Sequence, residues 1–372
     1  MGPGHYSPYV QQSIVRLGTW LPFEQVPEGL AHFTRVTVTR ETARRLTEGA
    51  GAAWVAWETA AVERLEQEGP PGPAGPAVQQ VSVDGAMVPL VHREWAEVKT
   101  LAIGTVEVRA GRDGPTPRCT ALSYFSRLTD APMFRRLMRL ECHRRGTATA
   151  GTVCGIVDGA EWCQQCLDWH CPQAVRILDF GHAAEHVATA ARVVFGEGTA
   201  ALSEWLGPQL HTLRHGDPAD VLAALRALPV AAAGEPGLAT ATRDAVVAYL
   251  DKRQAQITYA AFTAAGYPIG SGAVESANKL VVEARLKGSG MHWARANVNA
   301  MVALRNVACS DRWAATWDTL QAEQRRHTRH RRQARAAAKR PPPAAPPPTF
   351  RSMRAAVARL PLRSRRARSH PP

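Results

Sequence analysis

The order of the predicted elements restricts the fold of this chain more than any other feature. An apolar run at 81–83 is followed by predicted strands at 96–108 and 120–127, an amphipathic helix at 130–145 and an apolar strand at 153–157. Because the helix separates the last strand from the others, the first and fourth strands can lie side by side and parallel, with the helix as the crossover. The sequence therefore predicts an α/β fold with a mixed sheet flanked by helices.

Two of these strands are each followed by an acidic residue. Asp84 and Asp158 both stand directly after an apolar run and before a Gly-Ala pair. A carboxylate at the carboxyl end of a strand is a favoured ligand position in α/β sheets. Because adjacent strands lie about 4.8 Å apart, these two carboxylates could share or bracket a divalent cation. Taken singly, each Asp-Gly pair is more simply explained as a turn.

A third acid, Glu275, follows a Gly-Ser-Gly turn and lies just inside a predicted helix. It could instead close a capping-box-like helix start, three residues after Gly272. Together with Asp84 and Asp158, however, it supplies the carboxylate oxygens that Mg²⁺ prefers, with water and a phosphate as the remaining ligands. We therefore expect a Mg²⁺ site here, in which Mn²⁺ can substitute.

An Asp-His pair follows another apolar strand, predicted at 174–178. Asp179 ends this strand, and His182 follows three residues later. One interpretation gives the pair a supporting role near the acids, orienting DNA or a metal-bound water. In the alternative, Asp179 is the N-cap of the next helix and His182 packs in its first turn.

Four blocks of sequence resemble the DDE transposases of the Kra group of bacterial insertion sequences, which have a ribonuclease H-like catalytic core. The two longer blocks are YPIGSGAVESANK at 267–279 and RLKGSGMHW at 285–293. The shorter blocks, VDGAEW at 157–162 and ILDFGHAAEH at 177–186, match the group in type and order. The resemblance spans roughly residues 13–313.

This resemblance implies a function as well as a fold. It implies that Asp84, Asp158 and Glu275 hold Mg²⁺, cleave DNA at the ends of an insertion sequence and transfer the freed strand to target DNA. It also implies a homo-oligomer on paired ends and a cytoplasmic, nucleoid-associated location. Asp179 and His182 resemble the Asp-x-x-His signature found in several DDE families. The helical stretch between Asp158 and Glu275 resembles insertions that hold DNA ends or a partner subunit.

One feature departs from the group. Its members carry an N-terminal segment with paired cysteines, expected to be a zinc-binding DNA reader, and this chain begins at Met1 without it. The first alternative to an active transposase is therefore a truncated, catalytically idle DNA-binding remnant. The second is a structure-specific nuclease with the same core, which would cut DNA without joining strands.

The formal net charge of +13 is concentrated at the carboxyl end. Residues 325–368 contain 15 Lys and Arg and no Asp or Glu, and subtracting 15 from +13 leaves the first 324 residues at −2. We predict that the basic, proline-rich tail, 319–372, is disordered. Its cations could add salt-sensitive, sequence-independent affinity for DNA by releasing counterions, or they could simply be solvated.

Two groups of basic residues are the candidates for DNA contacts. Arg285 and Lys287 follow the Glu275 helix and would lie beside the metal site, although solvation of a helix surface explains them equally well. The tail candidates are Arg325, Arg326, Arg329, Arg331 and Arg332.

Composition and periodicity divide the chain into six segments. They are an N-terminal helical region, 1–66; a Gly-Pro linker, 67–78; the first part of the catalytic core, 79–186; an all-helical insertion, 187–262; the core helices that carry Glu275, 263–318; and the tail, 319–372. The first segment contains predicted helices at 22–33 and 40–49, with Thr39 as the N-cap of the second. This pattern fits a helix-turn-helix or ordinary helical packing.

The chain has seven cysteines, no secretory signal and no long apolar span. These features predict a reduced, cytosolic protein outside the membrane. Cys163 and Cys166, with His170 and Cys171 nearby, superficially resemble a zinc knuckle. They lie on a predicted helix and lack a second spaced pair, so we consider them weak candidates for zinc.

Overall fold

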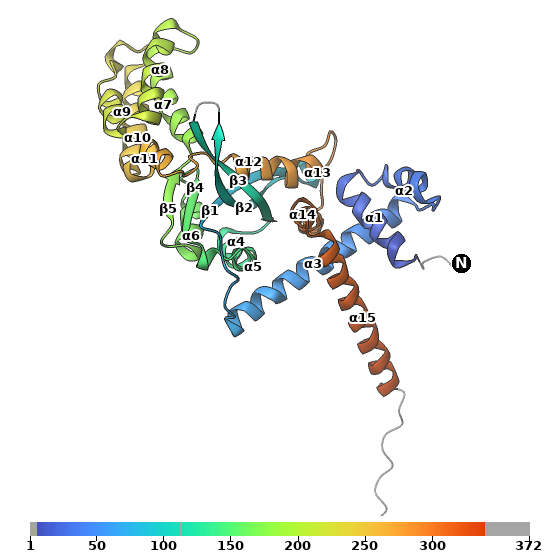
Figure 1. Ribbon diagram of the computed structural model, residues 1–372. Coiled ribbons are helices and arrows are strands. Elements are labelled where there is room, and N and C mark those ends of the chain that lie inside the picture. The colour runs from blue at the N-terminus through green and yellow to red at the C-terminus, as the bar shows by residue number, and fades with distance from the viewer. Residues whose placement is uncertain (1–5, 112–113, 339–372) are drawn as a thin grey trace, which may run out of the picture. The chain divides into compact units, whose positions relative to one another are not determined.

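The computed structural model describes residues 6–111 and 114–338, and the chain divides into two units, Met1–Leu320 and Gln321–Pro372. Within the described residues, the sheet of the first unit has the strand order β3-β2-β1-β4-β5. The strands are β1 (Val78–Pro89), β2 (Trp95–Gly111), β3 (Gly114–Arg127), β4 (Thr152–Val157) and β5 (Val175–Leu178). The pairs β1–β2 and β2–β3 are antiparallel, whereas β1–β4 and β4–β5 are parallel. The predicted mixed sheet, with its first and fourth strands adjacent and parallel, is confirmed (Figure 1).

One face of the sheet is covered by helices that lie on either side of β4 in the sequence. They are α4 (Ala131–Leu137), α5 (Arg139–Arg144) and α6 (Glu161–His170). Val81 and Val83 of β1 pack against them, because alternate residues of a strand point to the same face. α4 begins where the Asp130 carboxylate accepts a hydrogen bond from the Met133 N–H at 2.8 Å, which caps the helix.

The opposite face carries a run of helices from the carboxyl-terminal part of the first unit. They are α12 (Gly272–Ala277), the π-helix η5 (Asn278–Glu283), α13 (Ala284–Leu286) and α14 (Arg295–Cys309). Ala86 and Val88 of β1 pack in the apolar cluster that these helices form with the sheet. A π-helix shifts carbonyl groups out of the usual hydrogen-bond pattern. Here the buried guanidinium of Arg305 donates to the carbonyls of Leu280 and Val281 and so holds the π-helix in place.

Each element between β5 and α12 is helical. The helices are α7 (Phe180–Phe195), α8 (Ala200–His215), α9 (Pro218–Arg226), α10 (Pro236–Asp251) and α11 (Tyr259–Ala264), with short 3₁₀ turns between some of them. Their apolar sides pack with Ile156 of β4 and Ile177 of β5 in one cluster. None of the helices in the described ranges combines the length and the apolar character needed to span a membrane.

The N-terminal helices are α1 (Pro8–Trp20), α2 (Val26–Thr34) and α3 (Arg40–Glu68). The predicted cap of α3 is confirmed, because the Thr39 hydroxyl accepts a hydrogen bond from the Thr42 N–H at 3.1 Å. The predicted end of this helix near residue 49 is wrong. Gly51 does not end the helix because it is the point where α3 touches the backbone of α14 at Ala300, and any Cβ there would clash. Tertiary packing thus outweighs the low helix propensity of glycine.

The prediction that the tail is disordered from residue 319 is wrong for its first part. α15 (Trp313–Ala338) continues as a helix through that segment. Its residues beyond 320 are mostly Ala, Gln, Glu and Arg, which are good helix formers, and no proline occurs before residue 341. Glu323 and Arg326 also form an ion pair of 2.9 Å along the helix. Residues 339–372 of the predicted tail lie outside the described residues.

Candidate active site

Asp84 and Asp158 lie on neighbouring parallel strands at the same level of the sheet. The β1–β4 register pairs Val78 with Thr152 and ends at Val81 with Gly155. Continued for three more residues, this register sets Asp84 opposite Asp158. Asp158 directly follows the last residue of β4, as the sequence predicts. Each acid therefore lies three residues beyond the last β1–β4 pair, and the charge of Asp158 acts on Asp84.

Strand β1, in contrast, does not end at Asp84. It continues to Pro89 beside its long antiparallel partner β2, so the Asp-Gly pair here is not a turn. A Cβ at Gly85 would meet the carboxylate end of the Glu97 side chain, which is partly exposed and can move aside. Asp84 is thus held within the β1–β2 pairing, opposite Thr100, and not at a strand end.

The Asp84 carboxylate is half-buried and lies among other charges. One oxygen accepts a hydrogen bond from the Gly85 N–H at 2.7 Å, and the other accepts one from the Asn278 side-chain amide at 2.8 Å. Burial raises the pKa of Asp84, and the negative charges of Asp158 and Glu275 raise it further, against the opposing effect of Gly85 and His182. A bound cation would relieve this repulsion.

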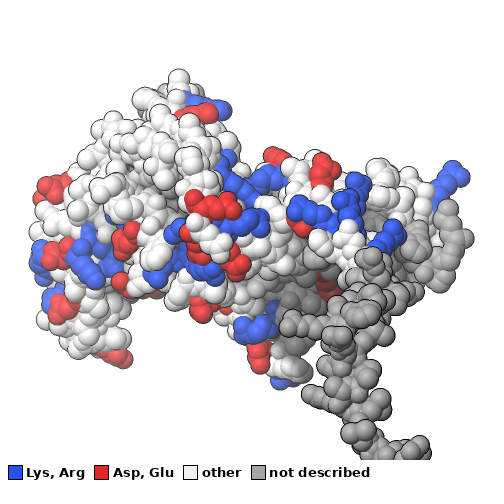
Figure 2. All heavy atoms as spheres, turned by 90° about the horizontal axis from the view of Figure 1, so that it is seen from below, with Lys and Arg blue, Asp and Glu red and all other residues white. Residues whose placement is uncertain are grey.

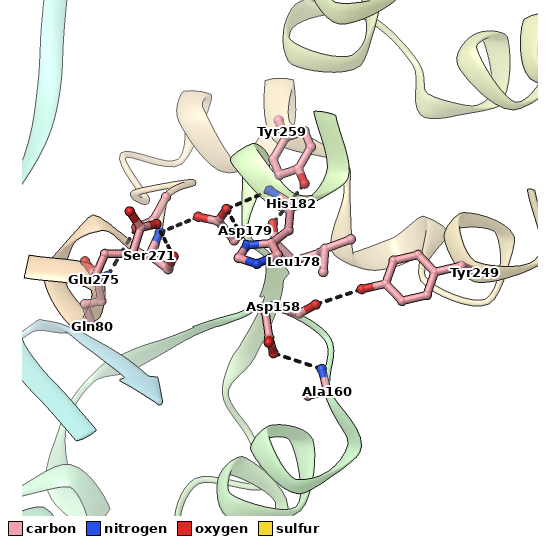
Figure 3. Close-up of polar contacts among 11 residues, drawn as sticks. Gln80, Asp158, Ala160, Leu178, Asp179, His182, Tyr249, Tyr259, Ser271 and Glu275 are labelled. Atoms are coloured by element: carbon pink, nitrogen blue, oxygen red, sulfur yellow. Dashed lines mark hydrogen bonds and ion pairs between the residues drawn. The ribbon is translucent and has the colours of Figure 1, made fainter. Parts of the chain in front are cut away.

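Asp158 is positioned by its own loop and by the helical segment α10. Its carboxylate accepts a hydrogen bond from the Ala160 N–H at 2.9 Å, at the start of α6. The Tyr249 hydroxyl donates to the Asp158 carbonyl at 2.7 Å (Figure 3). Arg253 donates to the Gly159 carbonyl at 2.9 Å. The Arg253 guanidinium also lies over the Tyr249 ring, 3.9 Å from its centre. The chain on both sides of the Asp158 side chain is therefore held in place.

Glu275 lies in the first turn of α12 and is exposed. Its carboxylate accepts a hydrogen bond from the hydroxyl of Ser271, the residue before the helix, at 3.0 Å. The Ser271 N–H in turn donates to Asp179 at 2.6 Å, and Gln80 of β1 donates to the Gly270 carbonyl at 3.3 Å. These contacts attach the helix that carries Glu275 to β1, which carries Asp84, and to the end of β5.

Asp179 and His182 connect β5 to the same network. Asp179 is the N-cap of α7, and one of its oxygens accepts hydrogen bonds from the His182 N–H at 2.8 Å and the ring Nδ1 at 3.1 Å. Figure 3 shows the chain of contacts that runs from Glu275 through Ser271 and Asp179 to His182. Burial would raise the pKa of Asp179, but the hydrogen bonds from His182 and Ser271 lower it to about 2. The same hydrogen bond raises the pKa of His182. The N-cap role of Asp179 is confirmed, but His182 is exposed and not packed in the first turn as the alternative predicted. The supporting role of the pair beside the acids stays a prediction.

Asp84, Asp158 and Glu275 offer the type of ligand atom that Mg²⁺ prefers, but their side chains do not converge on one point in the structure. Among the residues that the structure describes, no three His, Cys, Asp or Glu side chains form a group that could hold a metal ion. The charges of Asp158 and Glu275 both raise the pKa of Asp84, so the three carboxylates lie near one another. All three offer the oxygen atoms that Mg²⁺ binds. Mg²⁺ commonly takes one or two carboxylates and completes its shell with water and substrate phosphate. Asp84 and Asp158 supply that minimum.

The predicted DNA contacts near Glu275 need correction for one residue. Arg285 is only 2% exposed: its guanidinium lies 4.7 Å from the centre of the Phe23 ring and 5.0 Å from that of Trp293. Packing of the N-terminal segment against α13 buries it, so it is not a surface contact beside the metal site. Lys287 is exposed and forms an ion pair of 2.7 Å with Glu283.

The tail arginines named above lie in α15 and are exposed. Helical spacing places Arg325, Arg329 and Arg332 along one side of the helix. Elsewhere, Figure 2 shows Lys and Arg interspersed with Asp and Glu over the face that it displays. This mixture agrees with the near-zero formal charge of the first 324 residues, for which the sequence gives −2.

Sequence reasoning missed three side chains that touch the acids or their backbone. Asn278 lies three residues after Glu275, within the same recognisable block, and that position was the available signal. Tyr249 lies in α10 and Arg253 just after it, far from either aspartate in the sequence, and nothing in the pattern of this segment indicates that it contacts the chain after β4.

The two cysteines considered for zinc are buried in the core between α6 and the sheet. The Cys163 thiol donates to the Val83 carbonyl at 3.6 Å. Burial raises the pKa of Cys163 and raises that of Cys166 to about 12, which opposes the thiolate form that zinc requires. We assign them a packing role.

Comparison with protein-family models and with curated proteins gives no match for this chain. The functional interpretation therefore depends on the geometry of the site and on the resemblance of the four sequence blocks.

The hydrogen bonds of Asp179 lead to a stability prediction. Replacing Asp179 with Asn is expected to lower the free energy of unfolding by about 2 kcal/mol at pH 7, since each pKa unit corresponds to about 1.4 kcal/mol. Because the folded-state pKa lies below the ordinary value of 3.8, this stabilisation is present above pH 3.8 and is lost as the pH falls towards 2. Urea denaturation at several pH values measures it.

The matched control is Asp217→Asn, at the exposed N-cap of α9, where the carboxylate accepts a hydrogen bond from Ala219 at 2.8 Å. Asn caps helices about as well as Asp, so we expect a change of at most about 0.5 kcal/mol. Equal losses in the two variants, or a loss for Asp179→Asn that persists unchanged at low pH, would contradict the assignment.

Proposed function

We propose that the chain is a DDE-type transposase that cleaves DNA at the ends of an insertion sequence and joins the freed strand to target DNA. The observation that carries the proposal is that Asp84 and Asp158 each follow the last β1–β4 pair by three residues, with Asp158 and Glu275 both close enough to raise the pKa of Asp84. Metal-dependent phosphoryl transfer needs such a group of oxygen donors and no protein nucleophile.

The sheet supports the proposal that the core is ribonuclease H-like. Its first three strands are antiparallel neighbours, and β4 then joins the free side of β1 in parallel. This arrangement is the one expected from the element order, and it puts one acid on β1 and one after β4. The third acid comes from a helix that packs on the same sheet.

Each carboxylate has a distinct set of partners that would orient it for the reaction. Asn278 and the Gly85 N–H would orient Asp84, Tyr249 would hold the loop of Asp158, and Ser271 would direct Glu275. Mg²⁺, when bound by the three acids, would supply charge neutralisation at the phosphate and an activated water or 3′-hydroxyl. The His182 side chain, whose pKa is raised by its hydrogen bond with Asp179, would offer a hydrogen-bond donor near the same phosphate.

The test is an assay of cleavage and joining with the purified full chain. Labelled DNA from the ends of the element is incubated with Mg²⁺, and the products are examined for 3′-hydroxyl ends and for joining to a target plasmid. Cleavage with joining supports the transposase. Cleavage of branched or unpaired DNA without joining would favour the nuclease, and binding without cleavage would favour the idle remnant.

The helix α15 gives a prediction about the DNA partner. Replacing Arg325, Arg326, Arg329, Arg331 and Arg332 with Gln is expected to weaken DNA binding and to flatten its salt dependence. Each lost phosphate contact should reduce the slope of log K against log salt by about 0.9. Fluorescence anisotropy at several salt concentrations measures this slope.

The control keeps the charge and the helix by replacing the same five residues with Lys. Because counterion release depends on charge, the Lys variant should keep the slope of the unmodified chain. A Gln variant with an unchanged slope would remove α15 from the DNA interface.

A further inference from the structure

A pocket of about 420 Å³ lies between the N-terminal segment and the chain that follows the Glu275 helix. Phe23, Arg40 and Arg44 line one side of it, and Arg285, Trp293 and Asn297 line the other. None of the three acids proposed to hold Mg²⁺ lines this pocket. It is therefore a separate feature of the molecule, and the proposed reaction does not use it.

The wall of the pocket contains a buried cation with unused donors. Arg285 Nε donates to the Gly18 carbonyl at 3.2 Å, and the hydrogen-bond partner of Nη1 among the described residues is the Met291 sulfur, at 3.9 Å. Its Nη2 has no hydrogen-bond partner among the residues described. Burial lowers the pKa of Arg285 to about 10, so the side chain is still charged at neutral pH. A buried guanidinium with free N–H groups is unfavourable unless an anion or acceptor satisfies it.

The amino end of α14 lies at the same pocket. Ala294 is its N-cap residue and lines the pocket, and it provides no side-chain hydrogen bond to the first turn. α14 is 15 residues long, so its free N–H groups carry the partial positive charge of a full helix. Such an end attracts anions, phosphate groups above all. The amino end of α14 and the Arg285 guanidinium together give the floor of the pocket a positive electrostatic potential.

The lining as a whole has three cations, Arg40, Arg44 and Arg285, against two carboxylates, Glu24 and Glu48. Both carboxylate oxygens of Glu48 already accept a hydrogen bond, one from Arg44 at 2.9 Å and the other from Asn297 at 2.9 Å. Arg40 has no carboxylate within ion-pair distance in the described part of the chain. Glu24 and His292 complete the titratable groups of the lining, and both are exposed. Arg40 and Arg285 are thus the cations available to an incoming anion.

We propose that this pocket binds the phosphoryl group of a nucleotide, with Arg285 and the amino end of α14 at its floor and Arg40 at its opening. A guanidinium fork and a helix amino end are matched to phosphate oxygens. The volume of about 420 Å³ exceeds what a bare phosphate fills and leaves room for the attached nucleoside. The nucleotide can be free or part of a DNA strand, because the recognised chemistry is the same. The proposal does not rest on the transposase assignment.

The test is isothermal titration of the full chain, in EDTA, with three probes: dAMP, deoxyadenosine and a single-stranded oligonucleotide. We expect dAMP to bind at least about tenfold more tightly than deoxyadenosine, since one charge-assisted hydrogen bond changes affinity by about that factor or more. Arg40→Gln should weaken dAMP binding by about tenfold for the same reason. Arg45→Gln is the matched control: it is exposed on the same helix, does not line the pocket and should leave binding unchanged.

The two sources of the phosphoryl group give different results. If the oligonucleotide also loses affinity in Arg40→Gln, the pocket receives a phosphate of DNA; if only dAMP does, it receives a free nucleotide. Absence of dAMP binding, equal binding of deoxyadenosine, or equal effects of the Arg40 and Arg45 variants would overturn the proposal. Arg285→Lys, checked for folding by circular dichroism, provides a second variant that should also weaken dAMP. Because no cleavage is measured, failure of the proposed function leaves this result unaffected.

Discussion

Replacing Asp158 with Asn is expected to lower the rate of Mg²⁺-dependent strand cleavage about a thousandfold. The substitution keeps the size of the side chain, and the amide oxygen of Asn can still accept a hydrogen bond from the Ala160 N–H. It removes one of the two negative charges that follow the β1–β4 pairing. Metal ions stabilise the transition state by several kcal/mol, and each tenfold in rate corresponds to about 1.4 kcal/mol. Single-turnover cleavage of labelled end DNA measures the effect.

Asp168→Asn is the control for this substitution. Asp168 lies in α6, its side chain is 68% exposed, and it forms a surface ion pair with Arg176 at 2.8 Å. We expect cleavage within about twofold of the unmodified rate, because surface ion pairs contribute little. An Asp158→Asn chain that folds and still cleaves at the unmodified rate would refute the role given to Asp158.

Replacing Arg127 with Met is expected to lower the free energy of unfolding by about 3–5 kcal/mol, which is the usual cost of leaving one partner of a buried ion pair alone. Arg127 ends β3 and forms an ion pair with Glu58 of α3, and both side chains are 3% exposed. Arg127 also donates to the Ser126 carbonyl at 2.9 Å and lies over the Phe125 ring. The pair therefore fastens the N-terminal helix to the sheet. Urea denaturation followed by circular dichroism measures the loss.

Two controls separate the lost pair from other effects of the substitution. Arg226→Met breaks an ion pair with Asp251 whose side chains are about half exposed, and we expect a change of at most about 1 kcal/mol. The double variant Glu58→Met with Arg127→Met removes both charges and should recover most of the stability. A double variant as unstable as Arg127→Met would show that packing, and not the unpaired charge, sets the loss.

Local patterns predict the elements of the sheet well because each strand is a separate apolar run. The alternation of β1 and the short runs of β4 and β5 are visible in the sequence, and the helix between β3 and β4 determines which strands are parallel. The pattern fails at Asp84, where a local turn preference predicts a strand end. The long partner β2 extends β1 past Gly85, and such pairing is a long-range effect that the Asp-Gly pair does not encode.

The absence of long-range contacts from local sequence patterns also explains which site residues could be predicted. Asp158, Asp179 and Glu275 can be located because they stand at the ends of recognisable elements. The burial of Arg285 cannot, since it depends on Phe23, which is far away in the sequence. Composition also misjudges the tail, because a basic segment without proline can be helical and solvated at once, as in α15.

The most direct test of the central claim is equilibrium binding of Mn²⁺, followed by electron paramagnetic resonance, to the full chain with uncleavable end DNA. We predict that Asp84→Asn, Asp158→Asn and Glu275→Gln each weaken Mn²⁺ binding at least about tenfold, because each removes one carboxylate ligand. The exposed-acid variant Asp168→Asn should bind Mn²⁺ as the unmodified chain does. Mn²⁺ binding that is unchanged by the loss of any of the three acids would show that they do not form one metal site.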